Sequence, residues 1–200
     1  LTHNTSAVGM IINRVNPEKL PSKIAHAADK KLDRSLVSRE EREQKLAQKA
    51  MTFWITGLHA SGKNEVAYQL ERYLFDLGRT AIVLNGSMLR SGLNRELGFD
   101  KADRDENLRR VAEMAKLLND QGLIVIAVFI SPDRETRQQV KEIIGPQRYK
   151  EIFIDTKLEA CQTRDTEGLY AKAAQGKLRH FPGIDSPYES GTADIIISDL

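Results

Sequence analysis

The sequence predicts a doubly wound α/β domain with a mostly parallel sheet. From Met51 onward, short apolar runs alternate with amphipathic segments of helical period. The run 123–130 is apolar without interruption, as expected of a central parallel strand that is buried on both faces. A glycine-rich turn also joins the first apolar run to the first helical segment. Together these features are typical of consecutive βαβ units.

Each element follows from a local pattern. The first strand is expected at 53–56, and the first helix runs over 63–77 because its apolar residues recur at helical spacing before Gly78. Further strands are expected at 80–84, 123–130, 149–155 and 194–198, and further helices at 105–121, 135–144, 157–164 and 169–175. Such domains normally cover the last strand with another helix, which we expect to be missing here.

The first 50 residues differ from the rest. Residues 1–12 form a short apolar, extended tail, whereas 13–50 are polar, charged and interrupted by prolines. We interpret 13–50 as a charged linker with short helices, the clearest at 38–49, where serine and glutamate occupy the positions of a capping box. The charges can form a docking surface, but solvated helix faces are the favoured interpretation. The α/β domain then comprises 51–200.

Composition excludes several classes of partner. The net charge of +2 over 200 residues gives no reason to expect a nucleic-acid ligand. No apolar run approaches the roughly 20 residues that span a bilayer, and we expect neither a membrane partner nor a signal peptide. The single cysteine, Cys161, suits a reducing cytoplasm. We expect Cys161 to pack as a small apolar side chain rather than act as a nucleophile.

A phosphate-binding loop is predicted between the first strand and the first helix. A glycine, four residues and a Gly-Lys pair fit the P-loop motif, in which backbone N–H groups and a helix N-terminus surround phosphate oxygens. Lys63 would then bind the β- and γ-phosphates. A tight turn that only joins two elements is the alternative. The predicted ATP-binding residues are Gly57, Leu58, His59, Ala60, Ser61, Gly62, Lys63 and Asn64.

Two residues of this loop are unusual. Asn64 occupies the position of the Ser or Thr that normally coordinates Mg²⁺, although an amide oxygen can also bind a hard cation, so Asn64 is a weak candidate metal ligand. The side chain of His59 is expected to face solvent, and contact with a phosphate is the alternative.

Five segments, taken with the P-loop, resemble the adenylylsulfate kinase family: 93–99, 103–110, 129–132, 168–170 and 181–189. The resemblance runs from about residue 38 to 199. It implies a P-loop nucleoside triphosphate hydrolase/kinase fold. The implied activity is that of a transferase of sulfate assimilation, which uses ATP and Mg²⁺ to convert adenosine 5′-phosphosulfate (adenylylsulfate) into 3′-phosphoadenylylsulfate.

The same resemblance implies a substrate pocket. Its members are Arg90, Phe99, Arg104, Asn107, Ile130, Ser131 and Phe181. The two phenylalanines can sandwich an adenine ring, and the two arginines can bind a phosphosulfate through paired hydrogen bonds. Core aromatic residues and surface ion pairs are the alternatives. The resemblance further implies a mobile lid whose basic side chains close over ATP, with a solvated basic loop as the alternative. These lid residues are Lys172, Lys177 and Arg179.

Three further positions depart from the family pattern. Where the family has Asp-Gly-Asp-Asn after the second strand, this chain has Asn85 and Ser87 in place of the two acids, and Glu167 replaces a lysine near the substrate. The resemblance assigns Asn85 to the altered metal position and Ser87 to the altered base position. Neither is a base near neutral pH, and loss of a positioned base costs about 10²- to 10⁴-fold in rate.

The sequence therefore leaves three functions open. They are an active kinase, a catalytically degenerate nucleotide-binding regulatory domain, and a structural domain with an empty P-loop. Residues 4–11 resemble the end of the last β-barrel in the GTPase-type large subunit of bacterial sulfate adenylyltransferase, and 37–42 resemble the segment that joins it to a kinase in bifunctional chains. This implies a fused or associated sulfate adenylyltransferase, and the family also implies a homodimer.

Overall fold

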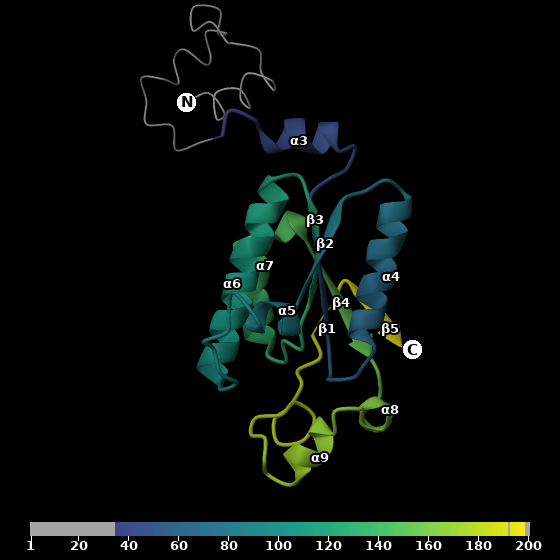
Figure 1. The fold of residues 1–200 in the computed structure, drawn as a ribbon, viewed down its shortest axis with the longest axis vertical. Coiled ribbons are helices and arrows are strands. Elements are labelled where there is room, and N and C mark those ends of the chain that lie inside the picture. The colour runs from purple at the N-terminus through teal and green to yellow at the C-terminus, as the bar shows by residue number, and fades with distance from the viewer. Residues whose placement is uncertain (1–34, 192, 199–200) are drawn as a thin grey trace, which may run out of the picture. The chain divides into compact units, whose positions relative to one another are not determined.

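The computed structural model describes residues 35–191 and 193–198, so the predicted tail 1–12 lies outside the described residues. From Arg39 onward the chain forms one compact unit of alternating strands and helices (Figure 1). The elements in chain order are α3 (Arg39–Lys45), β1 (Thr52–Gly57), α4 (Lys63–Asp76), β2 (Ala81–Asn85), α5 (Gly86–Arg90), α6 (Lys101–Asp120), β3 (Ile124–Val128), α7 (Arg134–Ile144), η2 (Pro146–Arg148), β4 (Tyr149–Asp155), α8 (Leu158–Arg164), α9 (Leu169–Ala174) and β5 (Ile195–Ser198).

The five strands form one parallel sheet in the order β2-β3-β1-β4-β5. β1 is central, because it pairs in parallel with β3 on one side and β4 on the other. β2 joins β3 and β5 joins β4, again in parallel. The predicted fold class, a doubly wound α/β domain with a mostly parallel sheet, is confirmed.

Alternate residues of the central strands bury into two separate cores. Trp54, Val125 and Ala127 pack with residues of α6 and α7, which cover one face of the sheet (Figure 1). Ile55 and Ile126 pack with α4 on the opposite face. All five residues of β3 are buried, as predicted for a parallel strand covered on both faces.

Element boundaries differ from the prediction where a polar side chain satisfies a backbone group. α6 begins at Lys101 rather than Asp105 because the Asp100 side chain accepts a hydrogen bond from the backbone N–H of Asp103 at 2.9 Å. α3 ends at Lys45 rather than continuing to 49. Gln48 instead contacts the domain, since its amide donates to the carbonyl oxygens of Thr80 and Gly122 at 3.0 and 2.8 Å.

The short helix α5 was not predicted. It begins immediately after β2, where the side chain of Asn85 accepts a hydrogen bond from the backbone N–H of Met88 at 2.8 Å. Its first residues, Gly86 and Ser87, are poor helix formers, so the helix depends on this cap. The turns after β1, β2, β3 and β4 all leave the carboxyl edge of the sheet, which is where open α/β sheets bind ligands.

Candidate functional site

The loop after β1 has a backbone that only glycine suits at two positions. Gly57 has φ 150°, and a Cβ there would lie 2.7 Å from the carbonyl oxygen of Ile154. Gly62 has φ 91° and precedes α4, whose N-terminus has no side-chain cap. The first N–H groups of a helix have no intrahelical partner, so they are available to an anion. The geometry therefore supports phosphate binding rather than a simple connecting turn.

Lys63 is buried inside this loop. Its Nζ donates hydrogen bonds to the carbonyl oxygen of Leu58 and, at 3.3 Å, to the hydroxyl of Ser61. Burial lowers the pKa of Lys63 to about 8. The loop is fixed from the neighbouring strand as well, because the Thr156 hydroxyl donates to the carbonyl oxygen of Ser61 at 2.8 Å. An anion that replaces Leu58 as the partner of Nζ would restore the full positive charge.

The turn after β2 supplies no carboxylate at the two altered positions. Asn85 caps α5 with its oxygen, and its amide nitrogen donates to the Tyr68 hydroxyl at 3.1 Å. Ser87 is exposed on the first turn of α5. Asn64, at the start of α4, is also exposed. Among residues 35–191 and 193–198, no group of three His, Cys, Asp or Glu side chains is arranged to hold a metal ion.

Arg90 and Phe99, two of the predicted substrate residues, contact each other. The guanidinium carbon of Arg90 lies 4.2 Å from the centre of the Phe99 ring, and Arg90 donates to the carbonyl oxygens of Leu97 and Gly98 at 2.9 and 2.7 Å. These bonds hold the arginine under the ring. Phe99 is 70% exposed, so it is not a core aromatic residue. An exposed ring supported from one side is suited to stacking with a planar ligand.

Arg104 lies next to the second predicted ring. Its Nη1 donates to the carbonyl oxygen of His180 at 2.6 Å, immediately before Phe181. Its Nε is buried without a hydrogen-bond partner among the described residues, although a buried guanidinium nitrogen normally has one. Asp185 orders the same segment by accepting the backbone N–H groups of His180 and Phe181.

The other predicted substrate residues lie deeper in the domain. Asn107 is buried on α6, and its side-chain oxygen accepts from the amide of Asn94 at 2.8 Å. Ser131 is also buried and accepts a hydrogen bond from the indole N–H of Trp54 at 3.0 Å. The carbonyl oxygen of Ile130 accepts from the Thr56 hydroxyl at 2.6 Å. Ser131 and Ile130 therefore fix the end of β3 to β1, whereas Asn107 joins α6 to the segment that follows α5.

The side chain of His59 was expected to face solvent, and this expectation was wrong. Its Nε2 lies 3.2 Å from Oδ1 of Asp165, whose side chain is only 2% exposed. The imidazole also packs against the rings of Tyr170 and Phe181, with centroids 5.8 and 6.0 Å away. A buried carboxylate requires hydrogen-bond donors, and the nearby histidine supplies one.

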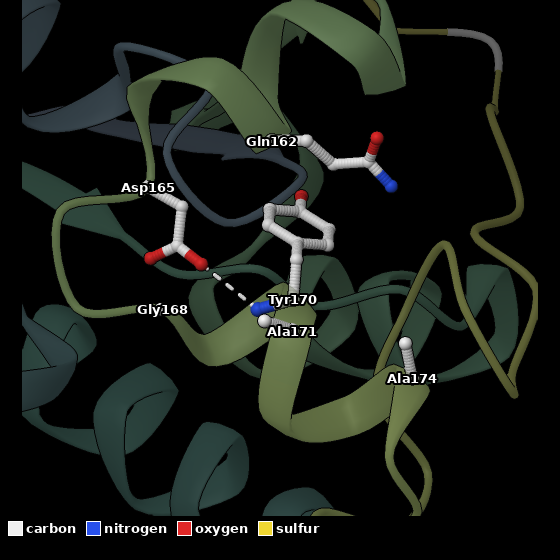
Figure 2. A pocket seen from close by; sticks show the side chains of 6 residues that line it. All are labelled: Gln162, Asp165, Gly168, Tyr170, Ala171 and Ala174. Carbon is white, nitrogen blue, oxygen red and sulfur yellow. Dashed lines mark hydrogen bonds between the residues drawn. The ribbon is translucent and has the colours of Figure 1, made fainter.

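The predicted lid consists of α9 and the loop that follows it. Lys172, Lys177 and Arg179 are exposed, and Lys172 donates to the carbonyl oxygen of Glu167 at 3.1 Å. An open pocket of about 330 Å³ lies between α8 and α9 (Figure 2). Its wall consists of Gln162, Asp165, Gly168, Tyr170, Ala171 and Ala174. It includes none of the predicted phosphate or acceptor residues, so the pocket belongs to the lid.

The structure thus places Lys63 inside the loop after β1, Arg90 against Phe99, and Arg104 beside the backbone of His180. Sequence reasoning missed Asp165 and the role of Tyr170. The sequence signal that could have indicated Asp165 is its position. It follows the helical segment 158–164 and lies three residues before Gly168, which precedes the next helix. Cys161 is fully buried, as expected of a packed apolar side chain.

Comparison with known proteins gives a consistent result. The family model for adenylylsulphate kinase matches residues 49–198. A probable adenylyl-sulfate kinase of Bacillus subtilis is 47% identical over 163 residues, covering 82% of this chain and 83% of its own. The structure of the Mycobacterium tuberculosis APS kinase CysC in complex with AMPPNP and APS has a TM-score of 0.72 at 45% identity, covering 75% of this chain and 88% of the other.

A further relative is longer than the matched region. The bifunctional enzyme NodQ of Azospirillum brasilense is 48% identical over 157 residues, which cover 78% of this chain but only 25% of NodQ. In the part of the chain that the structure describes, no helix combines the length and apolar character needed to cross a bilayer.

Proposed function

The chain belongs to the adenylylsulfate kinase family, and we propose that it transfers the γ-phosphoryl group of ATP to the 3′-hydroxyl of adenylylsulfate. The observation that carries this proposal is the P-loop, in which Lys63 is buried behind the uncapped N-terminus of α4. Such a buried cation would be costly to retain in a loop with no anionic ligand. The product would be 3′-phosphoadenylylsulfate, with ADP released.

On the ATP-binding (donor) side, we infer that the triphosphate lies along the loop 57–63. There it would replace the Leu58 carbonyl oxygen as the hydrogen-bond partner of Lys63. The N–H groups at the start of α4 would hold the β-phosphate, and Lys63 would balance the charge that develops between the β- and γ-phosphates. Lys172, Lys177 and Arg179 would then close over the nucleotide and exclude water. Glu167, one residue before Gly168, would oppose this effect with a negative charge.

On the acceptor side, the adenine of adenylylsulfate would stack on Phe99 and reach Phe181. Arg104 supports this assignment because its buried Nε has no partner among the described residues and can donate to an anionic ligand. Arg90 can contribute positive charge below Phe99. Asn107, Ile130 and Ser131 would shape the pocket floor at the end of β3.

The weak point of the proposed reaction is the turn after β2. Mg²⁺ prefers carboxylate and phosphate oxygens, whereas this chain offers the amides of Asn64 and Asn85, and the Asn85 oxygen already caps α5. The protein's own donors therefore fit the metal poorly. Ser87 cannot take the 3′-hydroxyl proton at neutral pH. Phosphoryl transfer depends mainly on positioning and electrostatics, so slow turnover is expected.

The test is a coupled assay of ADP release with adenylylsulfate and Mg-ATP. We expect turnover that is slow and depends on both substrates. Turnover no greater than that of the Lys63→Ala variant would reject the kinase assignment.

A second function is favoured by the same turn. A degenerate regulatory domain would bind adenylylsulfate or its 3′-phosphorylated product without catalysis, and the commitment of Asn85 to capping supports it. Calorimetry with each nucleotide separates the two functions, because the regulatory domain predicts binding with no ADP release. A domain with an empty P-loop predicts instead no thermal shift with millimolar ATP, ADP or adenylylsulfate.

We also propose that the domain acts with a fused or associated sulfate adenylyltransferase and forms a homodimer in the cytoplasm. The fused arrangement is supported by the resemblance of 4–11 and 37–42 and by the similarity to a bifunctional enzyme. Light scattering of the purified chain tests the dimer. Co-purification with a sulfate adenylyltransferase from the native source tests the association.

A further inference from the structure

The side chain of His59 lies where three separate segments meet. It belongs to the P-loop, but its neighbours are Asp165 after α8, Tyr170 on α9 and Phe181 in the lid loop. Tyr170 and Phe181 also contact each other edge to face, with centroids 5.1 Å apart. One side chain of the donor loop therefore contacts both the start of the lid and a ring of the acceptor side.

In the hydrogen bond between His59 and Asp165, the donor and the acceptor can be assigned. Asp165 is already ordered, because its carboxylate accepts the backbone N–H groups of Tyr170 and Glu167 at 2.8 and 3.2 Å, the first of which is drawn in Figure 2. Burial alone would raise the pKa of Asp165, but the hydrogen bonds from Tyr170 and His59 outweigh it and hold this pKa below its usual value. An ionised carboxylate only accepts hydrogen bonds, so Nε2 of His59 carries the proton.

A second bond joins the same two segments. The hydroxyl of Tyr170, a buried residue, donates to the carbonyl oxygen of His59 at 2.9 Å. The P-loop and the segment 165–170 are thus connected by two bonds, from the His59 side chain to the Asp165 carboxylate and from the Tyr170 side chain to the His59 backbone. Two hydrogen bonds and a ring cluster restrain the lid at its base, close to Lys63.

We propose that His59 is a positioning residue. It holds the base of the lid on the P-loop and fixes the position of the Phe181 ring that would contact adenylylsulfate. This inference rests on the proposed function for its catalytic consequence, but not for its structural part. In the part of the chain that the structure describes, the side-chain contacts of His59 are with Asp165, Tyr170 and Phe181, not with the turn after β2 that carries Asn85 and Ser87. Its loss should therefore weaken binding of adenylylsulfate more than it changes the chemical step.

The first experiment measures the lid without any substrate. Hydrogen–deuterium exchange of 165–181 is followed in the full chain for wild type, His59→Phe and His59→Gln. Phenylalanine keeps a ring without the donor, whereas glutamine keeps an Nε2 donor without the ring. Arg72→Gln, which removes an exposed ion pair with Asp76 on α4, is the control.

If His59 restrains the lid through Asp165, exchange of 165–181 rises about three- to tenfold in His59→Phe, as expected for the loss of one hydrogen bond of ordinary strength. His59→Gln should recover at least half of this protection, and Arg72→Gln should leave it unchanged. Equal exchange in wild type and His59→Phe overturns the proposal. So does an increase in both His59 variants that is equally large throughout 39–191, because this indicates general destabilisation.

The second experiment is a double-mutant cycle between His59→Phe and Asp165→Asn. If the two side chains act together, the double variant exchanges no faster in 165–181 than the faster single variant; additive effects contradict a direct link. In the coupled assay, His59→Phe should raise KM for adenylylsulfate by about fivefold or more with kcat within twofold, and His59→Gln should restore KM. A change in kcat alone contradicts the positioning role. If wild type shows no turnover, the proposed function fails while the exchange results still decide the structural link.

Discussion

The turns after β1 and β2 both lead from a parallel strand to the N-terminus of a helix, but they offer different groups to a ligand. After β1, the helix N-terminus is capped by no side chain, and a buried lysine lies beside it. After β2, Asn85 occupies the N-terminus of α5 and bonds to Tyr68 as well. The first turn is arranged to bind an external anion, whereas the second satisfies its polar groups internally.

Under the proposed function, the turn after β1 serves phosphate binding, whereas the turn after β2 would serve proton removal and metal binding. The loop after β1 retains the groups that we propose hold a phosphate, and the arginines and aromatic rings of the proposed acceptor side are also retained. The groups expected to remove a proton and to bind a metal are replaced, and Glu167 replaces an expected lysine. Four experiments alter one side of the comparison at a time.

The largest effect is expected when the turn after β2 is given its carboxylates. Asn85→Asp and Ser87→Asp together should raise turnover by about 10²- to 10⁴-fold, the usual contribution of a positioned base. Aspartate at 85 also retains the helix cap. The coupled assay measures the gain, and Ser91→Asp, an exposed position at the other end of α5, is the control. No gain over wild type would indicate that the acceptor side has lost more than these groups.

Removal of the charge on the donor side should reduce turnover by about 10²- to 10³-fold. Lys63→Ala leaves the developing charge between the β- and γ-phosphates without its cation, and a loss of this size is typical for one such positioned group. The assay compares it with Lys116→Ala on the exposed face of α6. Equal rates for the two variants would show that phosphate is not held by this loop.

Loss of the Phe99 ring should have a smaller effect than either of the two changes above. Phe99→Ala should weaken adenylylsulfate binding about five- to 150-fold, since stacking on a base contributes about 1–3 kcal/mol. Phe75 is a matched control, because it is 66% exposed and lies under Arg72, with 4.6 Å between the guanidinium carbon and the ring centre. Calorimetry of both alanine variants tests the assignment, which fails if they bind equally well.

The smallest effect is the pH dependence of ATP binding. The pKa of Lys63 is about 8 in the nucleotide-free loop, so the amine is charged below pH 8 and neutral above it. Anionic phosphates favour the charged form, so affinity should be constant below pH 8 and fall above it by up to about tenfold per pH unit. Titration with a fluorescent ATP analogue from pH 7 to 9.5 measures this, and Lys63→Arg, which stays charged, should remove the slope.

The fold could be predicted from the sequence because its signals are local and repeated. The helix α4 agrees with the predicted 63–77 to within one residue, since apolar spacing and a following glycine define it. The unbroken apolar run at β3 also predicted a strand buried on both faces. The strand order could not be predicted in this way, because it depends on pairing between distant segments.

The site was only partly predictable. The P-loop follows from spacing alone, because its glycines and lysine are adjacent in sequence. His59 and Asp165 are 106 positions apart, and nothing in either segment indicates that they meet. α5 was missed for another reason, since its stability comes from the cap at Asn85 rather than from its own residues.

The indole of Trp54 has a practical consequence for studies of folding. It is the chain's single tryptophan, it is fully buried on the central strand, and it stacks on Phe129 with 5.4 Å between ring centres. Strands at the middle of a sheet tend to open only in global unfolding. The fluorescence of one indole in a denaturant titration would therefore report the melting of the sheet, and loosening near α9 would leave that signal unchanged.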